Sequence, residues 1–241
     1  MDSTRVSEAP DSGSIPDEAT FFYSTVFTFH FIKFVQFYCM NIPFNSDIIL
    51  ENEHVHLSPL SLADVDNLLP VAILDETLIQ YSPAQIHSEP LLTNYISNFL
   101  KEKERGTRYP FVIFDKKTNS YAGSTSYLNI NLTHKRLEIG STWIGKDFQR
   151  TALNRNCKLL LLSYAFEVAD TERVEFLTDQ RNLQSQKAIE AIGARFEGIM
   201  RSHITMLDGY RRNSYCYSII KPEWPEVKIR LIENINKYNP Q

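Results

Sequence analysis

The sequence predicts an α+β domain of three layers, in which helices flank a mixed, mostly antiparallel sheet of six to seven strands. Strand-like and helix-like runs alternate in the order β–α–α–β–β–β–α–β–α–β–β. The β–α–β–α–β part of this order predicts a central parallel pair, because parallel strands need a crossover helix between them. Hairpin signals on either side of that part predict antiparallel edges.

Short apolar runs and capping signals define the first half of the domain. Ser61 precedes an apolar face at helical spacing and has Asp64 three residues further on, which is a capping pattern. Ser88 caps a second amphipathic helix, and Gly106 lies just past its end. Strands are expected at residues 53–57, 109–115, 121–130 and 136–144.

The second half continues with alternating helices and strands and then a hairpin. Asp208 and Gly209 form a strong hairpin signal, and Gly193 ends the helix before it. Pro222 and Pro225 are expected to break the chain before a last short helix. Helices are expected at residues 155–169, 182–192 and 227–235, and strands at residues 173–178, 194–206 and 212–220.

Composition narrows the function classes. The chain has 241 residues, of which 43% are apolar and 22% charged, as in ordinary globular proteins. Its net charge of −4 argues against nucleic-acid binding, because phosphate neutralisation needs a basic face. The three cysteines are odd in number and fit no zinc spacing. We therefore expect a cytoplasmic protein without a metal site.

Three segments are expected: an N-terminal extension over residues 1–40, the domain over residues 41–221, and a tail over residues 222–241 with the short amphipathic helix. The acidic, polar start of the extension is predicted to be disordered. The short C-terminal helix has an apolar face, which makes this helix a candidate for a homodimer contact.

The extension also contains an aromatic-rich run, residues 21–40. This run is long enough to span a bilayer, but His30 and Lys33 near its middle disfavour a membrane segment. The alternative is an extension that packs on the domain or is loosely ordered. Met40 begins the run MNIPF, so an internal start there is a second hypothesis.

The run from Trp143 to Asn154 joins the end of a strand to a leucine-rich helix through a short polar loop. Such a loop leaves backbone N–H groups at a helix N-terminus, where they can hold an anion. The layout suits the pyrophosphate of coenzyme A. Ala152 stands where a glycine would be expected to let the phosphate approach closely.

A second motif lies in the run TDQRNLQSQKAIEAIGARFEGIMRSHITMLDGYRRNSYCYSII, which contains Asn182 three residues before Ser185, an Ile-Gly turn and the Asp-Gly hairpin. With the loop and the element order, it resembles the GNAT N-acetyltransferases, in the branch of the ribosomal-protein N-terminal acetyltransferases. The resemblance covers roughly residues 50–221. It implies a GNAT-like acyl-CoA N-acyltransferase fold. It also implies acetyl transfer from acetyl-CoA to a primary amine (a protein N-terminus, an amino acid or a small amine) by direct attack in a ternary complex.

The resemblance also implies roles for particular residues. Asn182 would bind the pantetheine arm, and Ser185 would contact the cofactor or help protonate its sulfur; the alternative for both is helix capping. The alternative for Trp143 is an ordinary core aromatic. Many relatives place a tyrosine acid four residues before the helix-ending glycine, where this chain has Ile189. The cofactor would be held by Trp143, Ile144, Gln149, Arg150, Thr151, Ala152, Leu153 and Asn154.

Glu138 is the candidate base that accepts the proton of the amine, directly or through water. It lies in the run LEIGSTWI, where a carboxylate is costly unless it is paired or solvated. The alternative is a structural glutamate in a salt bridge, and Glu175 is a weaker candidate. Strict alternation predicts one face with Glu138, Gly140 and Thr142, and another with Leu137, Ile139 and Trp143.

A second functional hypothesis is a non-catalytic acyl-CoA-binding or interaction module. Ala152 and Ile189 support it, because both depart from the enzyme pattern. The acceptor pocket is expected along the last two strands, from Arg201, His203, Tyr210 and Tyr215.

Overall fold

The computed structural model describes residues 40–238, which belong to one compact unit. The predictions for the acidic start and for nearly all of the aromatic-rich run lie outside the described residues. Met40 is the exception, and its side chain is buried in the domain. Among the residues that are described, no helix is long and apolar enough to cross a membrane.

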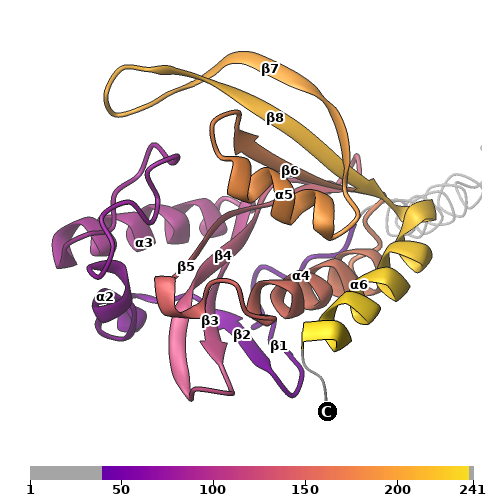
Figure 1. Ribbon diagram of the computed structural model, residues 1–241, viewed down its shortest axis with the longest axis horizontal. Coiled ribbons are helices and arrows are strands. Elements are labelled where there is room, and N and C mark those ends of the chain that lie inside the picture. Colours follow the sequence, from indigo (N-terminus) through magenta and orange to yellow (C-terminus); the bar gives the residue numbers. More distant parts are fainter. Residues whose placement is uncertain (1–39, 239–241) are drawn as a thin grey trace, which may run out of the picture. The chain divides into compact units, whose positions relative to one another are not determined.

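A sheet of eight strands forms the centre of the domain, in the order β1-β2-β3-β4-β5-β6-β8-β7 (Figure 1). All neighbouring strands are antiparallel except β5 and β6, which confirms the predicted mixed sheet with a central parallel pair. The sheet has one strand more than expected because β1, only two residues long, pairs with β2. The strands are β1 (Leu50–Glu51), β2 (Val55–Pro59), β3 (Arg108–Asp115), β4 (Ser120–Asn131), β5 (Arg136–Ile144), β6 (Arg173–Asp179), β7 (Arg195–Thr205) and β8 (Arg211–Ile220).

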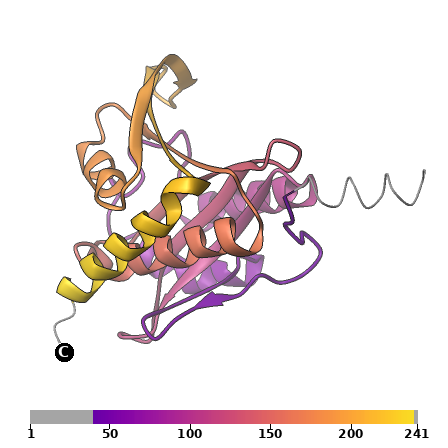
Figure 2. The same cartoon turned by 90° about the vertical axis from the view of Figure 1, so that its right-hand side faces the viewer.

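Helices cover both faces of the sheet. The helices α2 and α3 enclose a core with Val112 and Trp143 on one face. On the other face, α4, α5 and α6 enclose the larger core, and Figure 2 shows α4 and α6 side by side. The helices are α2 (Val65–Ala72), α3 (Glu89–Glu104), α4 (Leu153–Ser163), α5 (Leu183–Ala191) and α6 (Trp224–Tyr238), and a π-helical turn (Tyr164–Val168) follows α4.

The last helix, α6, is longer than the sequence predicted. Pro225 lies in its first turn, where the missing N–H costs no helical hydrogen bond, so the expectation that this proline breaks the chain before the helix is wrong. Its apolar face, with Trp224, Val227 and Leu231, is buried in the core beside α4. The helix therefore uses this face within its own domain.

A β-bulge interrupts the alternation of β5. Ser124 of β4 pairs with Trp143, and Ser126 pairs with Gly140, so β5 contains one extra residue between these pairs. The extra residue is accommodated at Ser141, which has a φ of 48°. Every side chain after the bulge therefore points to the face opposite to the one that strict alternation predicts.

This bulge overturns the predicted faces of Thr142 and Trp143. Trp143 packs against α2 and α3 and therefore lies on the same face of the sheet as Glu138, not on the other face. Thr142 instead contacts Lys158 of α4, on the other face of the sheet. The prediction failed because strict period-two alternation does not continue through a bulge.

We expect Gly123→Ala to destabilise the domain because Gly123 supports the end of β5. Gly123 has a φ of 151°, and an added Cβ would lie 2.0 Å from the carbonyl oxygen of Trp143. Gly198→Ala is the matched control, since Gly198 has a φ of 159° and no atom within 4 Å of the added Cβ. Because both variants carry backbone strain, the extra clash should make Gly123→Ala less stable by about 2 kcal/mol in urea denaturation. Equal stability of the two variants would contradict this account.

Candidate functional site

The parallel pairing of β5 and β6 is very short. It extends only through Arg136–Glu138 on β5 and Arg173–Glu175 on β6. Beyond this point the two strands separate, as Figure 1 shows, and residues 139–144 and 176–179 do not pair with each other. We call the separation between these two strand edges the slot. Backbone groups without a partner in the neighbouring strand can bond to an extended ligand that has amide groups of its own.

A loop at the N-terminus of α4 lies on one side of this slot. The first helical hydrogen bond of α4 runs from the N–H of Asn156 to the carbonyl oxygen of Ala152, at 3.0 Å. The backbone N–H groups before it therefore have no acceptor within the helix, and the helix dipole adds positive potential there. Thr151 shapes the loop: its hydroxyl donates to the carbonyl of Phe148 at 2.8 Å and accepts from the N–H of Leu153 at 3.2 Å.

Ala152 fits this loop without strain. Its φ is −73°, which is a helical value that any residue adopts, so a glycine is not needed for its backbone conformation. The left-handed conformation lies two residues earlier, at Arg150, with a φ of 60°. An arginine in this region costs about 1 kcal/mol, which is a modest penalty for a loop that presents amide groups.

Gln149, one of the predicted residues, connects the loop to the end of β5. The side-chain amide of Gln149 donates to the carbonyl of Ile144 at 2.9 Å, and Gln184 of α5 donates to Gln149 at 3.3 Å. Asn154 has a buried side-chain oxygen without a hydrogen-bond partner. An unpaired buried polar atom costs about 1–3 kcal/mol, so this oxygen is a candidate for contact with a ligand.

The structure places other predicted residues in structural roles. The side chain of Trp143 lies in the core between the sheet, α2 and α3, as the core alternative predicted. Asn182 caps α5 by accepting a hydrogen bond from the N–H of Ser185 at 3.0 Å, as the capping alternative predicted. This cap lies three residues after the end of β6. Ile189 is buried in the core.

Glu138 lies at the start of the slot, on the face that α3 covers. Its side chain is only 5% exposed and accepts a hydrogen bond from Asn129 at 2.7 Å. Burial is the main cause that raises the pKa of Glu138 from 4.5 to about 7, and the charge of Glu175 adds to it. Gly140 leaves room for this carboxyl group, because a Cβ at Gly140 would lie 2.9 Å from Oε1 of Glu138.

Two buried arginines near Glu138 were missed by the sequence analysis. Both act to lower the pKa of Glu138, but their effect is smaller than that of burial. Arg108 donates to Glu102 at 2.6 Å and to the hydroxyl of Ser141 at 3.0 Å. Arg212 donates to Ser214 at 3.0 Å and to the carbonyl of Tyr81 at 3.1 Å. Both stand at the start of a strand, where a charged residue is ordinary, so the sequence carried no local signal for them.

The predicted acceptor residues of the last hairpin make separate contacts. His203 contacts the hydroxyl of Ser214 at 3.0 Å. Tyr210 lies below the guanidinium of Arg181, 3.9 Å from the ring centroid. Tyr215 packs against Phe196 with the ring centroids 5.2 Å apart, and Arg201 is exposed. Glu175, the weaker candidate base, is held by Arg136 at 3.2 Å and by Arg173 at 2.9 Å.

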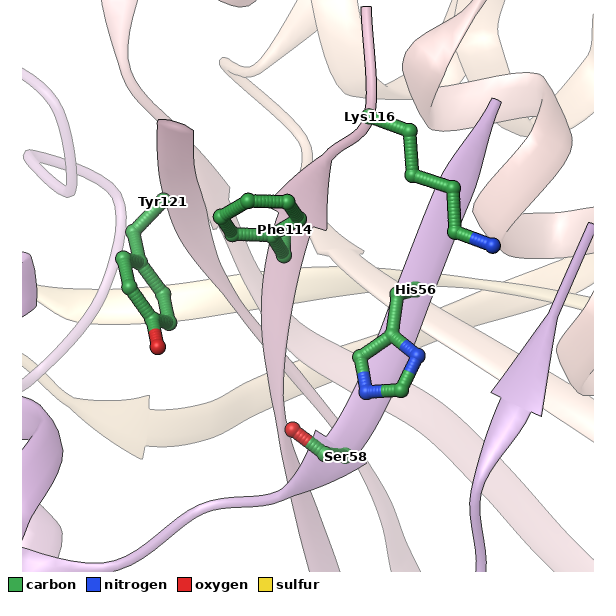
Figure 3. Close-up of a pocket in the computed structure, with 5 residues that line it drawn as sticks. All are labelled: His56, Ser58, Phe114, Lys116 and Tyr121. Carbon is green, nitrogen blue, oxygen red and sulfur yellow. The ribbon is translucent and has the colours of Figure 1, made fainter. Parts of the chain in front are cut away.

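A pocket of about 350 Å³ lies elsewhere, on the edge formed by β2, β3 and β4. In Figure 3, Phe114 and Tyr121 line one side of it and His56 and Lys116 the other. Both His56 and Lys116 contact Glu51, at 3.2 Å and 2.7 Å. The pocket contains none of the predicted site residues, so the slot and not this pocket is the candidate site. Within residues 40–238 no cluster of three or more His, Cys, Asp or Glu residues is placed to hold a metal ion.

Two groups that could take part in binding or catalysis lie on opposite faces of the sheet at the slot. Anion-binding amide groups lie on the α4 side of the slot. A carboxyl group with a pKa near neutrality lies on the α3 side. An extended thioester bound from one side can therefore meet a nucleophile that approaches from the other.

Comparison with known proteins agrees with this geometry. Residues 54–195 match the family model of the acetyltransferase (GNAT) domain. A curated relative, "Putative ribosomal N-acetyltransferase YdaF" of Bacillus subtilis (strain 168), is 25% identical over 183 residues, which are 72% of this chain and 94% of the relative.

Solved structures give the same result. A structure described as a "putative acetyltransferase" from T. thermophilus is 34% identical, has a TM-score of 0.72, and covers 81% of this chain and 98% of its own. Mycobacterium smegmatis RimJ in complex with CoA-disulfide shares the fold at 19% identity and a TM-score of 0.67, over 78% of this chain and 93% of its own. The predicted resemblance to this family is therefore confirmed.

The raised pKa of Glu138 predicts a specific pH dependence of stability. An acid whose pKa is raised from 4.5 to about 7 on folding contributes stability that is fully present below the lower value and is lost as the pH rises through the higher one. Glu138→Gln keeps the shape but cannot ionise. Between about pH 5 and about pH 8, wild-type protein should lose roughly 3 kcal/mol of unfolding free energy relative to this variant in urea denaturation. Parallel pH profiles would contradict the buried carboxyl.

Proposed function

Because the chain belongs to the acetyltransferase (GNAT) domain family, we propose that it transfers an acetyl group from acetyl-CoA to a primary amine by direct attack in a ternary complex. The observation that carries this proposal is the separation of β5 and β6 directly after Glu138. It leaves a slot with unpaired strand edges beside a helix N-terminus and a buried carboxyl group. These are the features that an extended acyl thioester with a pyrophosphate requires.

The residues of the slot suit coenzyme A. The amide groups at the start of α4 are the proposed contacts of the pyrophosphate, with Asn154 beside them. The free edge of β5 up to Trp143 and Ile144 is the proposed partner of the pantetheine amides. The related fold of RimJ has been solved with CoA-disulfide, which supports this choice of ligand.

Glu138 is the proposed base. An attacking amine must be neutral, yet a protein N-terminus has a pKa of about 8 and an alkylamine one of about 10. A carboxylate with a pKa of about 7 is ionised at slightly alkaline pH and still accepts a proton readily. The amine then attacks the thioester carbonyl, and Glu138 takes the proton that the nitrogen loses.

A protein N-terminus is the first acceptor class to test, because a relative is named as a ribosomal N-acetyltransferase. The proposed compartment is the cytoplasm, in keeping with the two free thiols among the described residues, Cys157 and Cys216. Calorimetry with acetyl-CoA tests the binding step. A thiol-release assay with peptides of varied N-termini, free amino acids and spermidine tests turnover. No binding overturns the proposal, and binding without turnover on any acceptor favours the non-catalytic module.

Asn154→Asp should weaken coenzyme A binding by at least about tenfold, because it places a carboxylate beside the pyrophosphate. Asn119→Asp is the matched control: it makes the same charge change in an exposed turn between β3 and β4. Calorimetric titration of both variants with coenzyme A gives the two dissociation constants. If Asn154→Asp binds as tightly as the control, the pyrophosphate does not lie at this loop.

Glu138→Gln should lower kcat by about 100-fold and leave the KM for acetyl-CoA nearly unchanged, because it removes the proton acceptor and no cofactor contact. Glu175→Gln provides the comparison, since Glu175 lies opposite Glu138 on β6 but is held by two arginines. Its kcat should fall much less. Steady-state thiol release measures both, and full activity of Glu138→Gln excludes Glu138 from the mechanism.

A further inference from the structure

Lys158 is a buried lysine without a carboxylate partner. It projects from α4 with only 6% of its surface exposed, and its ammonium group donates to the hydroxyl of Thr142 at 2.9 Å. Thr142 in turn lies 2.7 Å from the hydroxyl of Thr125. In the part of the chain that the structure describes, no carboxylate lies within ion-pair distance of Lys158. A buried ammonium with one neutral partner is costly, so its presence in this helix needs an explanation.

The environment of Lys158 makes it a proton donor of moderate strength. Burial lowers the pKa of its ammonium group from 10.5 to about 8. The ionisable group near it among the described residues is the thiol of Cys157, whose own pKa burial raises to about 12. Cys157 is therefore neutral, and Lys158 loses its positive charge just above neutral pH without a coupled change at Cys157.

The position of Lys158 matters more than its acidity. Its contact, Thr142, lies in the part of β5 that no longer pairs with β6, next to Trp143 and Ile144. Lys158 lies on the α4 face of this part of β5, where the hydroxyl of Thr142 also contacts Thr125 of β4, and the proposed pyrophosphate loop precedes the same helix. Glu138 approaches the slot from the α3 side. A thioester bound in the proposed slot would have a base on one face of the sheet and an ammonium group on the other.

We propose that Lys158 is the acid that protonates the departing thiolate of coenzyme A. The inference rests on the proposed acetyl transfer. Lys158 would supply the proton donor that is missing where many relatives have a tyrosine and this chain has Ile189. As the N–C bond forms and the C–S bond breaks, Glu138 takes a proton from the nitrogen and Lys158 gives one to the sulfur. After product release, Glu138 returns its proton to solvent and Lys158 regains one from it, so protons balance over one turnover.

A merely structural role for Lys158 is the competing explanation, because its bond to Thr142 also holds the bulge of β5. Three variants separate the two. Lys158→Met removes the amine and keeps an unbranched apolar chain that suits the buried site. Thr142→Val removes the hydroxyl partner and keeps the amine. Lys158→Arg keeps the positive charge but cannot release a proton near neutral pH.

If Lys158 is the acid, Lys158→Met should lose about 100-fold in kcat, with the KM for acetyl-CoA changed by less than about threefold. Thr142→Val should lose clearly less kcat than Lys158→Met, because it removes the hydroxyl partner of the ammonium group and not the proton donor itself. Wild-type kcat should fall as the pH rises above about 8, because deprotonated Lys158 has no proton to give to the sulfur. The pH profile of Lys158→Met should lack this fall in kcat at alkaline pH. Lys158→Arg should remain as slow as Lys158→Met.

Other outcomes overturn the assignment. Equal losses in Thr142→Val and Lys158→Met make Lys158 a positioning residue. Recovery of kcat in Lys158→Arg means that charge alone acts. Intact-mass spectrometry after incubation with acetyl-CoA should show no acetyl group on Lys158, since an acetylated lysine would be an acceptor. Thermal melting of each variant checks that it is folded.

The test also separates this inference from the proposed function. All assays use the full chain, acetyl-CoA and the acceptor with the fastest thiol release in the panel. A wild-type protein without turnover overturns acetyl transfer, and the role of Lys158 with it. An active wild type with a fully active Lys158→Met variant overturns only the role of Lys158.

Discussion

The short parallel contact between β5 and β6 is the constraint on which the rest of the site depends. Only three residues of each strand pair, because the strands then diverge. Each strand keeps an antiparallel partner on its other side, β4 for β5 and β8 for β6, so the sheet tolerates the separation. The domain thus consists of two antiparallel half-sheets joined by the short parallel pairing of β5 and β6. Beyond this pairing, the unpaired strand edges can form hydrogen bonds with an extended ligand.

The bulge at Ser141 is fastened from both faces of the sheet. On the α3 side, Arg108 donates to the hydroxyl of Ser141. On the α4 side, Lys158 donates to Thr142. Buried polar groups of this kind cost free energy unless they are satisfied, and each of these contacts satisfies part of that need. The bulge therefore redirects β5 at the point where the slot opens, and it has a fixed shape there.

Burial shifts the pKa values of the two ionisable groups of the slot in opposite directions. Burial disfavours charge, so it raises the pKa of Glu138 to about 7 and lowers the pKa of Lys158 to about 8. A carboxyl group and an ammonium group that normally titrate far apart thus meet near neutral pH. Such convergence suits a reaction that moves one proton off a nitrogen and another onto a sulfur.

The order of the elements, the mixed sheet, the family and the position of the loop before α4 could all be predicted from the chain alone, because periodicity, caps and turns are local signals. Which residues meet across the sheet depends on tertiary packing and could not be predicted in this way. The bulge at Ser141 reversed the predicted faces of Thr142 and Trp143, since one extra residue shifts every later side chain. The burial of Lys158 against Thr142 became visible only when β5 was placed beside α4. Burial and cross-strand proximity come from residues far apart in the chain, and no local pattern encodes them.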